Sequence, residues 1–160
     1  MKLAILSDTH GSIAAVEQVF AAASDAEMFL HAGDVTPDAK YLATLTEAPV
    51  YFVAGNCDWP EARVPLTRVI EAAGHRIFLA HGDSFGVRYT TEMLARAAAE
   101  QGCDLAVYGH THVAEVSIGT PVTVLNPGSA ARPRDGARGS FLTLDLRPDE
   151  LPVARLHRLS

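Results

Sequence analysis

Five short polar segments of this chain combine aspartate, histidine or asparagine with spacings that suit metal binding. They are Asp8-Thr9-His10, Gly33-Asp34, Gly55-Asn56-Cys57-Asp58, His81-Gly82 and Gly109-His110-Thr111-His112. Carboxylate, amide oxygen and imidazole are all competent ligands of divalent metals. In extended backbone, alternate side chains leave the same face, so both ends of an Asp-x-His or His-x-His segment can approach one ion. The residue types therefore indicate metal-assisted chemistry.

Each segment also has a structural explanation when it is taken alone. Asp-x-His and Gly-Asp occur in ordinary turns, Asn56 could be a residue that tolerates a left-handed turn, and His81-Gly82 could be a strand end. Gly-His-Thr-His is more specific, because two exposed imidazoles at strand spacing have few structural uses. The occurrence of all five segments, each after an expected strand, favours the metal site.

The elements expected around these segments alternate between strand and helix in the first half of the chain. Apolar runs and helical spacing predict strands at 2–6, 28–30, 50–53, 67–72, 76–80, 105–108, 113–118, 122–125, 140–146 and 153–159, and helices at 13–23, 38–45 and 91–101. The runs 67–72 and 76–80, joined through Gly74, predict a hairpin. Alternating strands and helices indicate a parallel sheet, and ligands bind beyond the carboxyl ends of such strands. We therefore expect an α/β fold of two facing sheets with helices outside.

Length and composition predict one globular domain over residues 1–160. A chain of this size buries roughly 70% of the surface that its unfolded form exposes. The sequence has no apolar run of the ~20 residues that a membrane-spanning helix needs. The apolar stretch 1–6 is too short for the core of a secretory signal, so we expect the cytoplasm. Cys57 and Cys103 are expected to be reduced.

The net charge of −6 argues against one class of partner. Its long-range field repels a polyanion, so long nucleic acid is an unfavoured partner, whereas small anions remain open. Bound divalent metals would reverse the sign of the charge locally. The basic stretch Arg132, Arg134 and Arg138 lies among proline and glycine and is expected to be a solvated loop.

The five segments, in this order, resemble those of the calcineurin-like metallophosphoesterases, and among them the small bacterial YfcE-like phosphodiesterases. The resemblance covers residues 1–129. It implies a four-layer α/β/β/α sandwich of two mixed sheets flanked by helices. It also implies that Asp34 bridges two divalent metals. One metal would be held by Asp8, His10, Asp34 and His112, and the other by Asp34, Asn56, His81 and His110.

The activity implied by the resemblance is hydrolysis of a small phosphate ester, with a diester as the first candidate. Two divalent ions against two carboxylates leave a charge of about +2, and a hydroxide between the ions takes it to about +1. That charge suits a diester monoanion attacked in line by the hydroxide. Mixed nitrogen and oxygen ligands suit manganese, our first choice, and also nickel, iron, zinc or cobalt. The residues predicted as catalytic are Asn56, His81, His110 and Asp58.

One departure from the larger enzymes of the superfamily concerns the leaving group. Those enzymes have histidine directly after the asparagine, where it is thought to protonate the leaving group, whereas this chain has Cys57. The small YfcE-like branch also tends to read Gly-Asn-Cys-Asp. A neutral thiol is a poor substitute for the histidine, so we expect aryl esters to be cleaved faster than alkyl esters.

Two other functions and several other residues stay open at this point. A member of the family in the eukaryotic retromer complex binds proteins, so a non-enzymatic scaffold is one alternative, and a nuclease acting on nucleotides or nucleic-acid ends is another. A homo-oligomer is compatible with the sequence. His31 is expected to be a satisfied strand histidine, and His75 and His157 are expected at the surface. The segment 126–129, Asn-Pro-Gly-Ser, is assigned to turn geometry.

Overall fold

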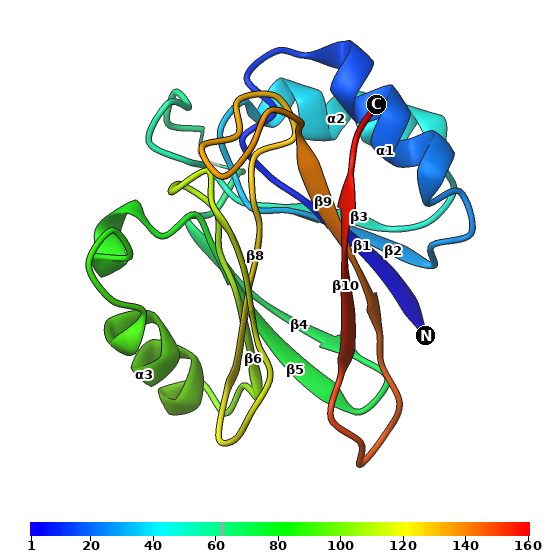
Figure 1. The fold of residues 1–160 in the computed structure, drawn as a ribbon. Helices are drawn as coiled ribbons and strands as arrows, with labels where there is room; N and C mark the ends of the chain where they lie inside the picture. The colour runs from blue at the N-terminus through cyan, green and yellow to red at the C-terminus, as the bar shows by residue number, and fades with distance from the viewer. Residues whose placement is uncertain (62) are drawn as a thin grey trace.

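The computed structural model describes residues 1–61 and 63–160, and this part of the chain forms two stacked sheets with helices outside (Figure 1). Within it, no helix has the length and apolar character to cross a lipid bilayer. The elements are β1 (Lys2–Leu6), α1 (Ile13–Ala22), β2 (Met28–His31), α2 (Thr36–Leu45), β3 (Val50–Phe52), β4 (Thr67–Ala72), β5 (His75–Ala80), the 3-10 turn η1 (Asp83–Phe85), α3 (Glu92–Glu100), β6 (Leu105–Val107), β7 (Ala114–Ser117), β8 (Thr123–Pro127), β9 (Ser140–Asp145) and β10 (Val153–Arg158).

Both sheets are mixed, with a parallel part and antiparallel edges. The first sheet has the order β10-β9-β1-β2-β3, in which β1, β2 and β3 are parallel. The second has the order β4-β5-β6-β8-β7, in which β5, β6 and β8 are parallel. The strands β9, β10, β4 and β7 pair antiparallel. The parallel parts place the carboxyl ends of six strands where polar loops can converge.

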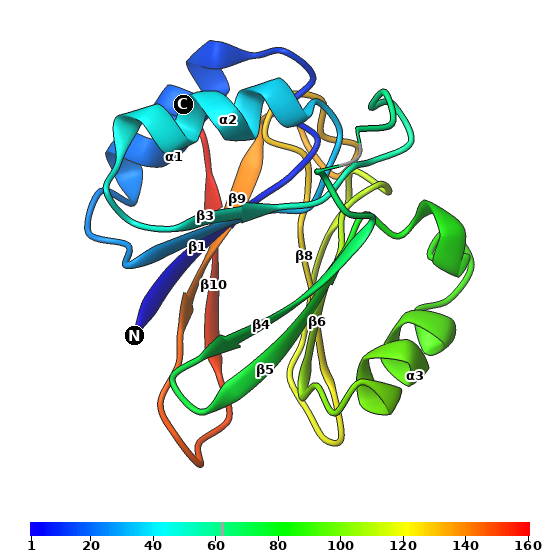
Figure 2. The ribbon, with the colours of Figure 1, turned by 180° about the vertical axis from the view of Figure 1, so that it is seen from behind.

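The layers are held by three apolar clusters, one between the sheets and one under the helices on each outer face. Leu3 and Ile5 of β1 face Leu79 and Leu125 of the second sheet across the middle of the sandwich. On the other side of β1, Leu6 packs with residues of α1 and α2, and α3 covers the second sheet. Figure 2 shows α1 and α2 on one outer face and α3 on the other. The expected four-layer α/β/β/α sandwich is confirmed.

Local boundaries differ from the expectation where side chains or turns extend an element. The helix expected from Asp38 begins at Thr36, because Pro37 fits the first helical turn. In that turn the buried Asp38 accepts the Gly11 N–H at 2.8 Å. In the hairpin between β4 and β5, Ala73 and Gly74 both have positive φ, which matches the twist of the flanking strands.

The expected surface position of His75 is wrong, because the side chain is buried at the end of the sandwich away from the predicted site segments. Its Nδ1 lies 2.5 Å from the Asp104 carboxylate and its Nε2 lies 2.8 Å from the Arg147 carbonyl. Burial acts to lower the pKa of His75, but these two acceptors outweigh it and the pKa is raised. The hairpin turn thus carries a charged pair that binds it to the loop before β6.

We predict that Asp104→Asn destabilises the protein by about 1 kcal/mol near pH 5 to 6, and by less as the pH rises. Because the pKa of His75 is higher in the folded than in the unfolded state, its protonated form stabilises the fold. This contribution to the free energy of unfolding is complete below the unfolded-state pKa of about 6.5. It is lost as the pH rises through the folded-state pKa. Urea unfolding at several pH values measures the difference. The control is Asp145→Asn, an exposed residue of β9. A destabilisation by Asp104→Asn that does not change with pH would contradict the prediction.

Candidate metal centre

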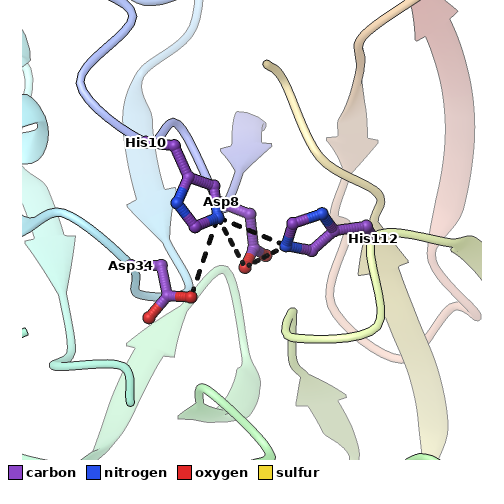
Figure 3. A group of neighbouring side chains, drawn as sticks. All are labelled: Asp8, His10, Asp34 and His112. Carbon is purple, nitrogen blue, oxygen red and sulfur yellow. Dashed lines mark hydrogen bonds and ion pairs between the residues drawn. The ribbon is translucent and has the colours of Figure 1, made fainter. Parts of the chain in front are cut away.

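Four of the predicted ligands meet at the carboxyl ends of strands from both sheets. Asp8 and His10 follow β1, Asp34 follows β2 and His112 follows β6. Each offers one donor atom, and these four atoms lie within 4.8 Å of one another. Figure 3 shows the two carboxylates and the two imidazoles pointing toward one common space. The set is the one that the family resemblance implied for the first metal.

The atoms that face one another in this group are carboxylate oxygens and imidazole nitrogens, and this arrangement fits a cation. His112 Nδ1 lies 2.7 Å from the Arg132 carbonyl, to which it can only donate, so the Nε2 of a neutral ring carries a lone pair. This Nε2 lies 3.3 Å from His10 Nε2 and 3.2 Å from Asp8 Oδ1. Asp8 Oδ1 is buried and has no hydrogen-bond partner among the described residues. A buried carboxylate oxygen without a donor is costly, and a bound cation would remove that cost.

A second group adjoins the first and contains the other predicted ligands. Asn56 Oδ1 lies 2.9 Å from His81 Nε2 and 3.0 Å from His110 Nδ1. His81 Nδ1 donates to the Ala32 carbonyl at 2.7 Å, which directs the other ring nitrogen into the group. His81 Nε2 lies 3.4 Å from Asp34 Oδ2. Asp34 is therefore shared by the two groups, as a bridging ligand would be.

The pKa values of these side chains show the same excess of negative charge. Burial alone would lower the pKa of His81, but Asp34 and Asp8 raise it to about 8. Burial acts to raise the pKa of Asp34, and the contacts with His81 and with the Cys57 N–H outweigh it and hold the pKa well below its usual range. Burial lowers the pKa of His10 and His110, which keeps both rings neutral and able to bind a metal.

The backbone at the site is held in conformations that most residues avoid. Five predicted ligands have φ in the left-handed region, between 45° and 67°, namely Asp8, His10, Asp34, His110 and His112. Such conformations persist only where the surroundings enforce them. Glycine is required beside the ligands, because a Cβ on Gly55 would lie 2.1 Å from Asp34 Oδ1 and one on Gly109 would lie 2.6 Å from Asp8 Oδ2. The approach of the segments leaves no space for larger side chains.

Asp58, predicted as catalytic, lies beneath the Asp34 loop with its carboxylate turned to the backbone. Its Oδ2 accepts the N–H groups of Asp34 and Gly55 at 3.1 and 2.8 Å. Its Oδ1 accepts those of Val35 and Thr36 at 3.0 and 2.8 Å. These four bonds fix the loop that carries Asp34 to the loop that carries Asn56. They make Asp58 a positioning residue, and a direct part in catalysis stays a prediction.

Other side chains support the ligand loops and carried no strong signal in the sequence. Ser129 Oγ donates to the Asp8 carbonyl at 2.8 Å. Asn126 Nδ2 donates to the Gly109 carbonyl at 3.0 Å, while its Oδ1 accepts the Gly128 N–H within the turn, as expected for this segment. His31 is a buried strand histidine, as expected, and contacts the Thr9 hydroxyl at 3.0 Å. Its burial lowers the pKa to about 4, so it stays neutral.

A cavity of about 480 Å³ opens above the two groups and gives them access to solvent. It is lined by His10, Asp34, Asn56, Cys57, Arg88, His110, His112, Arg132, Pro133 and Arg134. Burial and the nearby Asp34 raise the pKa of Cys57, so its side chain is a neutral thiol at the cavity wall. Arg132 and Arg134 are exposed, as a solvated loop predicts, but they also form part of this wall, which the sequence interpretation missed. The signal available for them was their position just after the Asn-Pro-Gly-Ser turn.

The fold and the two ligand groups define a metallophosphoesterase, and comparison with known proteins agrees. The family model for the calcineurin-like phosphoesterase superfamily domain matches residues 1–149. The chain belongs to this superfamily.

Named relatives fall in the same class. A probable metallophosphoesterase of Methanothermobacter thermautotrophicus is 36% identical over 138 residues, which are 84% of this chain and 80% of that protein. The phosphodiesterase YfcE of Escherichia coli is 33% identical over 91% of this chain and 88% of its own. The solved structure of that phosphoesterase superposes with a TM-score of 0.69 over the same shares. A structure of Vps29 from Entamoeba histolytica with zinc has a TM-score of 0.77 at 23% identity over 99% and 98% of the two chains, and this likeness shows the fold alone.

We predict that Asp58→Asn lowers the free energy of unfolding by about 1–3 kcal/mol, because an amide nitrogen would replace one of two oxygens that face backbone N–H donors. Urea unfolding measures the loss. The control is Asp25→Asn, since Asp25 is an exposed carboxylate whose side-chain partner is Lys2. Equal stability of Asp58→Asn and the wild type would show that the four bonds do not hold the loops.

Proposed function

We propose that the protein is a dinuclear metal-dependent phosphodiesterase that hydrolyses small organic phosphate esters. The observation that carries the proposal is the buried Asp8 Oδ1, which has no donor in the described part of the chain and faces imidazole nitrogens. A cation in that space would stabilise the carboxylate oxygen and the imidazole lone pairs directed at it. The superfamily membership and the diesterase activity named for a relative support the reaction class.

The ligand sets proposed here are those implied by the sequence. Asp8, His10, Asp34 and His112 would hold one ion, and Asp34, Asn56, His81 and His110 would hold the other. Two divalent ions at such a site supply Lewis-acid stabilisation of the phosphoryl oxygens and activate water as the nucleophile. The protein's part is to orient the imidazoles: Ala32 and Arg132 accept the Nδ1 protons of His81 and His112, which turns each Nε2 toward the proposed ions. We propose manganese as the first ion to test, followed by nickel, cobalt, zinc and iron.

The site residues and the net charge also bear on the two alternative functions, a protein-binding scaffold and a nuclease. A scaffold under no catalytic demand has no use for metal-binding side chains held close together on left-handed backbone. The likeness to Vps29 shows a shared fold and does not support a binding role for this chain. A nuclease acting on long nucleic acid is disfavoured by the net charge of −6. Cyclic nucleotides and other small diesters have a size that suits the cavity of about 480 Å³.

We predict that metal-stripped protein hydrolyses bis-para-nitrophenyl phosphate only after a divalent metal is added back, and faster than it hydrolyses para-nitrophenyl phosphate. Asp34→Asn and His81→Ala should each lower the rate by about 100-fold or more, since each change removes a ligand. The release of nitrophenolate is followed with each of the five metals and with magnesium. His157→Ala is the matched histidine control, because His157 lies in β10 and contacts Thr143.

The outcomes separate the proposed functions. Metal-dependent activity that both ligand variants lose, and that His157→Ala keeps, supports the phosphodiesterase. A folded wild-type protein that stays inactive with every metal would return the protein to the scaffold alternative. Faster hydrolysis of the monoester than of the diester would change the proposed reaction to a phosphomonoesterase.

We predict a steep dependence of rate on the leaving group, because Cys57 is a neutral thiol with a raised pKa and is a weak proton donor. In a series of aryl methyl phosphates, log kcat should fall as the pKa of the departing phenol rises. Cys57→Ala should leave the slope unchanged. A shallow slope in the wild type that becomes steep in Cys57→Ala would show that the thiol does protonate the leaving group.

A further inference from the structure

Three arginines line the cavity, and no described residue pairs with any of them. Arg88, Arg132 and Arg134 are exposed at the cavity wall. Their guanidinium groups make no ion pair or hydrogen bond within residues 1–61 and 63–160. Three arginines elsewhere in the described chain do have partners: Arg76 pairs with Glu71, Arg158 with Asp135, and Arg68 donates to the Phe52 carbonyl. Three guanidinium groups without a partner in the described part of the chain thus lie at the cavity that contains the candidate metal centre.

The loop with two of these arginines is fixed to a predicted metal ligand through its backbone. The Arg134 N–H donates to the His112 carbonyl at 2.9 Å, and the Arg132 carbonyl accepts from His112 Nδ1 at 2.7 Å. The Arg132 N–H donates to Ser129 Oγ at 2.7 Å. The two arginines use only main-chain atoms in these contacts, so their side chains remain available at the cavity wall. A substitution of either side chain leaves the contacts in place.

The third arginine, Arg88, reaches the cavity from the segment between η1 and α3. Arg88 follows the η1 turn after β5, where Tyr89 and Thr90 both donate backbone N–H groups to the Gly86 carbonyl. Burial is the main cause of the lowered pKa values of His10 and His110, and the charges of Arg132 and Arg88 act in the same direction. The positive charges therefore lie near the ligands from two separate segments.

The positive charge at this cavity is larger than the single negative charge of a phosphodiester requires for binding. Two ions and two carboxylates leave about +2 at the base, which already attracts the phosphate that is cleaved. The three guanidinium groups add a further positive charge each at the wall, in a protein whose net charge is −6. Guanidinium groups bind phosphate through paired, charge-assisted hydrogen bonds. A cavity of about 480 Å³ also has more volume than one phosphate fills.

We propose that Arg88, Arg132 and Arg134 bind a second phosphate of the substrate, and that the preferred substrates are small phosphodiesters with a further phosphate group. This inference rests on the proposed function, because the metal site must hold the phosphate that is cleaved. Arg132 and Arg134 are specificity residues in this account and do not take part in bond cleavage. Their removal should raise KM for the substrate with two phosphate groups and leave kcat little changed.

The test compares two substrates that release the same nitrophenolate. They are the para-nitrophenyl ester of thymidine 5′-phosphate and the same ester with a phosphate on the 3′ oxygen. The wild type with manganese should prefer the 3′-phosphorylated ester by about tenfold or more in kcat/KM. Arg132→Gln and Arg134→Gln should each remove most of that preference, with Arg→Lys at the same positions restoring part of it. Arg138→Gln is the matched control, because Arg138 lies in the same loop but does not line the cavity.

A second measurement does not depend on catalysis. Calorimetry measures binding of thymidine 3′,5′-bisphosphate to metal-free protein, in which Asp8 and Asp34 repel a phosphate at the base and the arginines supply the attraction. Affinity should fall about tenfold in Arg132→Gln, should stay unchanged in Arg138→Gln, and should weaken with added salt. Circular dichroism checks that each variant is folded.

The results distinguish this inference from the proposed function. Arginine-dependent binding of the bisphosphate without hydrolysis of either ester would support the anion site and refute the phosphodiesterase. An equal loss of kcat/KM for both esters in the arginine variants would overturn the inference, since the guanidinium groups would then act on the cleaved phosphate. Wild-type activity without preference for the 3′-phosphate, or metal-free protein without arginine-dependent binding, would overturn it as well.

Discussion

The structure depends on keeping carboxylate oxygens and imidazole nitrogens close together in a buried place. Asp8 Oδ1, His112 Nε2 and His10 Nε2 lie within 3.2 to 3.9 Å of one another. In water each of these atoms would accept a hydrogen bond, and in this site they face one another. Folding alone gives no gain from such an arrangement. The neighbouring loops, turns and glycines are explained once a cation is taken as the partner that these atoms require.

The supporting structure resists the separation of these atoms. Five predicted ligand residues adopt left-handed φ. The four backbone bonds to Asp58 and the bond from Ser129 to the Asp8 carbonyl stabilise the loops around them. Strain of this kind costs about 1–3 kcal/mol for each residue. Other interactions must offset this cost, and here the large core between the sheets is available to do so. The strained backbone thus lowers the stability of the fold but holds the predicted ligands in place before a metal binds.

The sequence was sufficient to predict which residues meet at the candidate metal centre and insufficient to predict what surrounds them. Asp8, Asp34 and His112 were predictable because their residue types, spacing and positions after apolar runs all indicate a metal site. The helices and strands that form the layers were predictable from apolar residues repeated every 3.6 or every 2 positions. Long-range partners carry no such local pattern. His75 pairs with a residue 29 positions away, and Arg134 reaches the cavity only because its loop returns to His112. Such contacts depend on the tertiary fold, which residue types alone do not specify.

The ligands come from both sheets, and this origin connects chemistry with folding. Asp8, Asp34 and Asn56 follow strands of the first sheet, while His81 and His112 follow strands of the second. A cation shared by these residues would join the two sheets at the edge where their parallel strands end. The unfolded chain lacks the preformed site, so the binding energy of the metal adds to the stability of the folded state. The same donor atoms that repel one another would thus attract a bound cation, and this attraction would make the metal-bound sandwich more stable than the core alone.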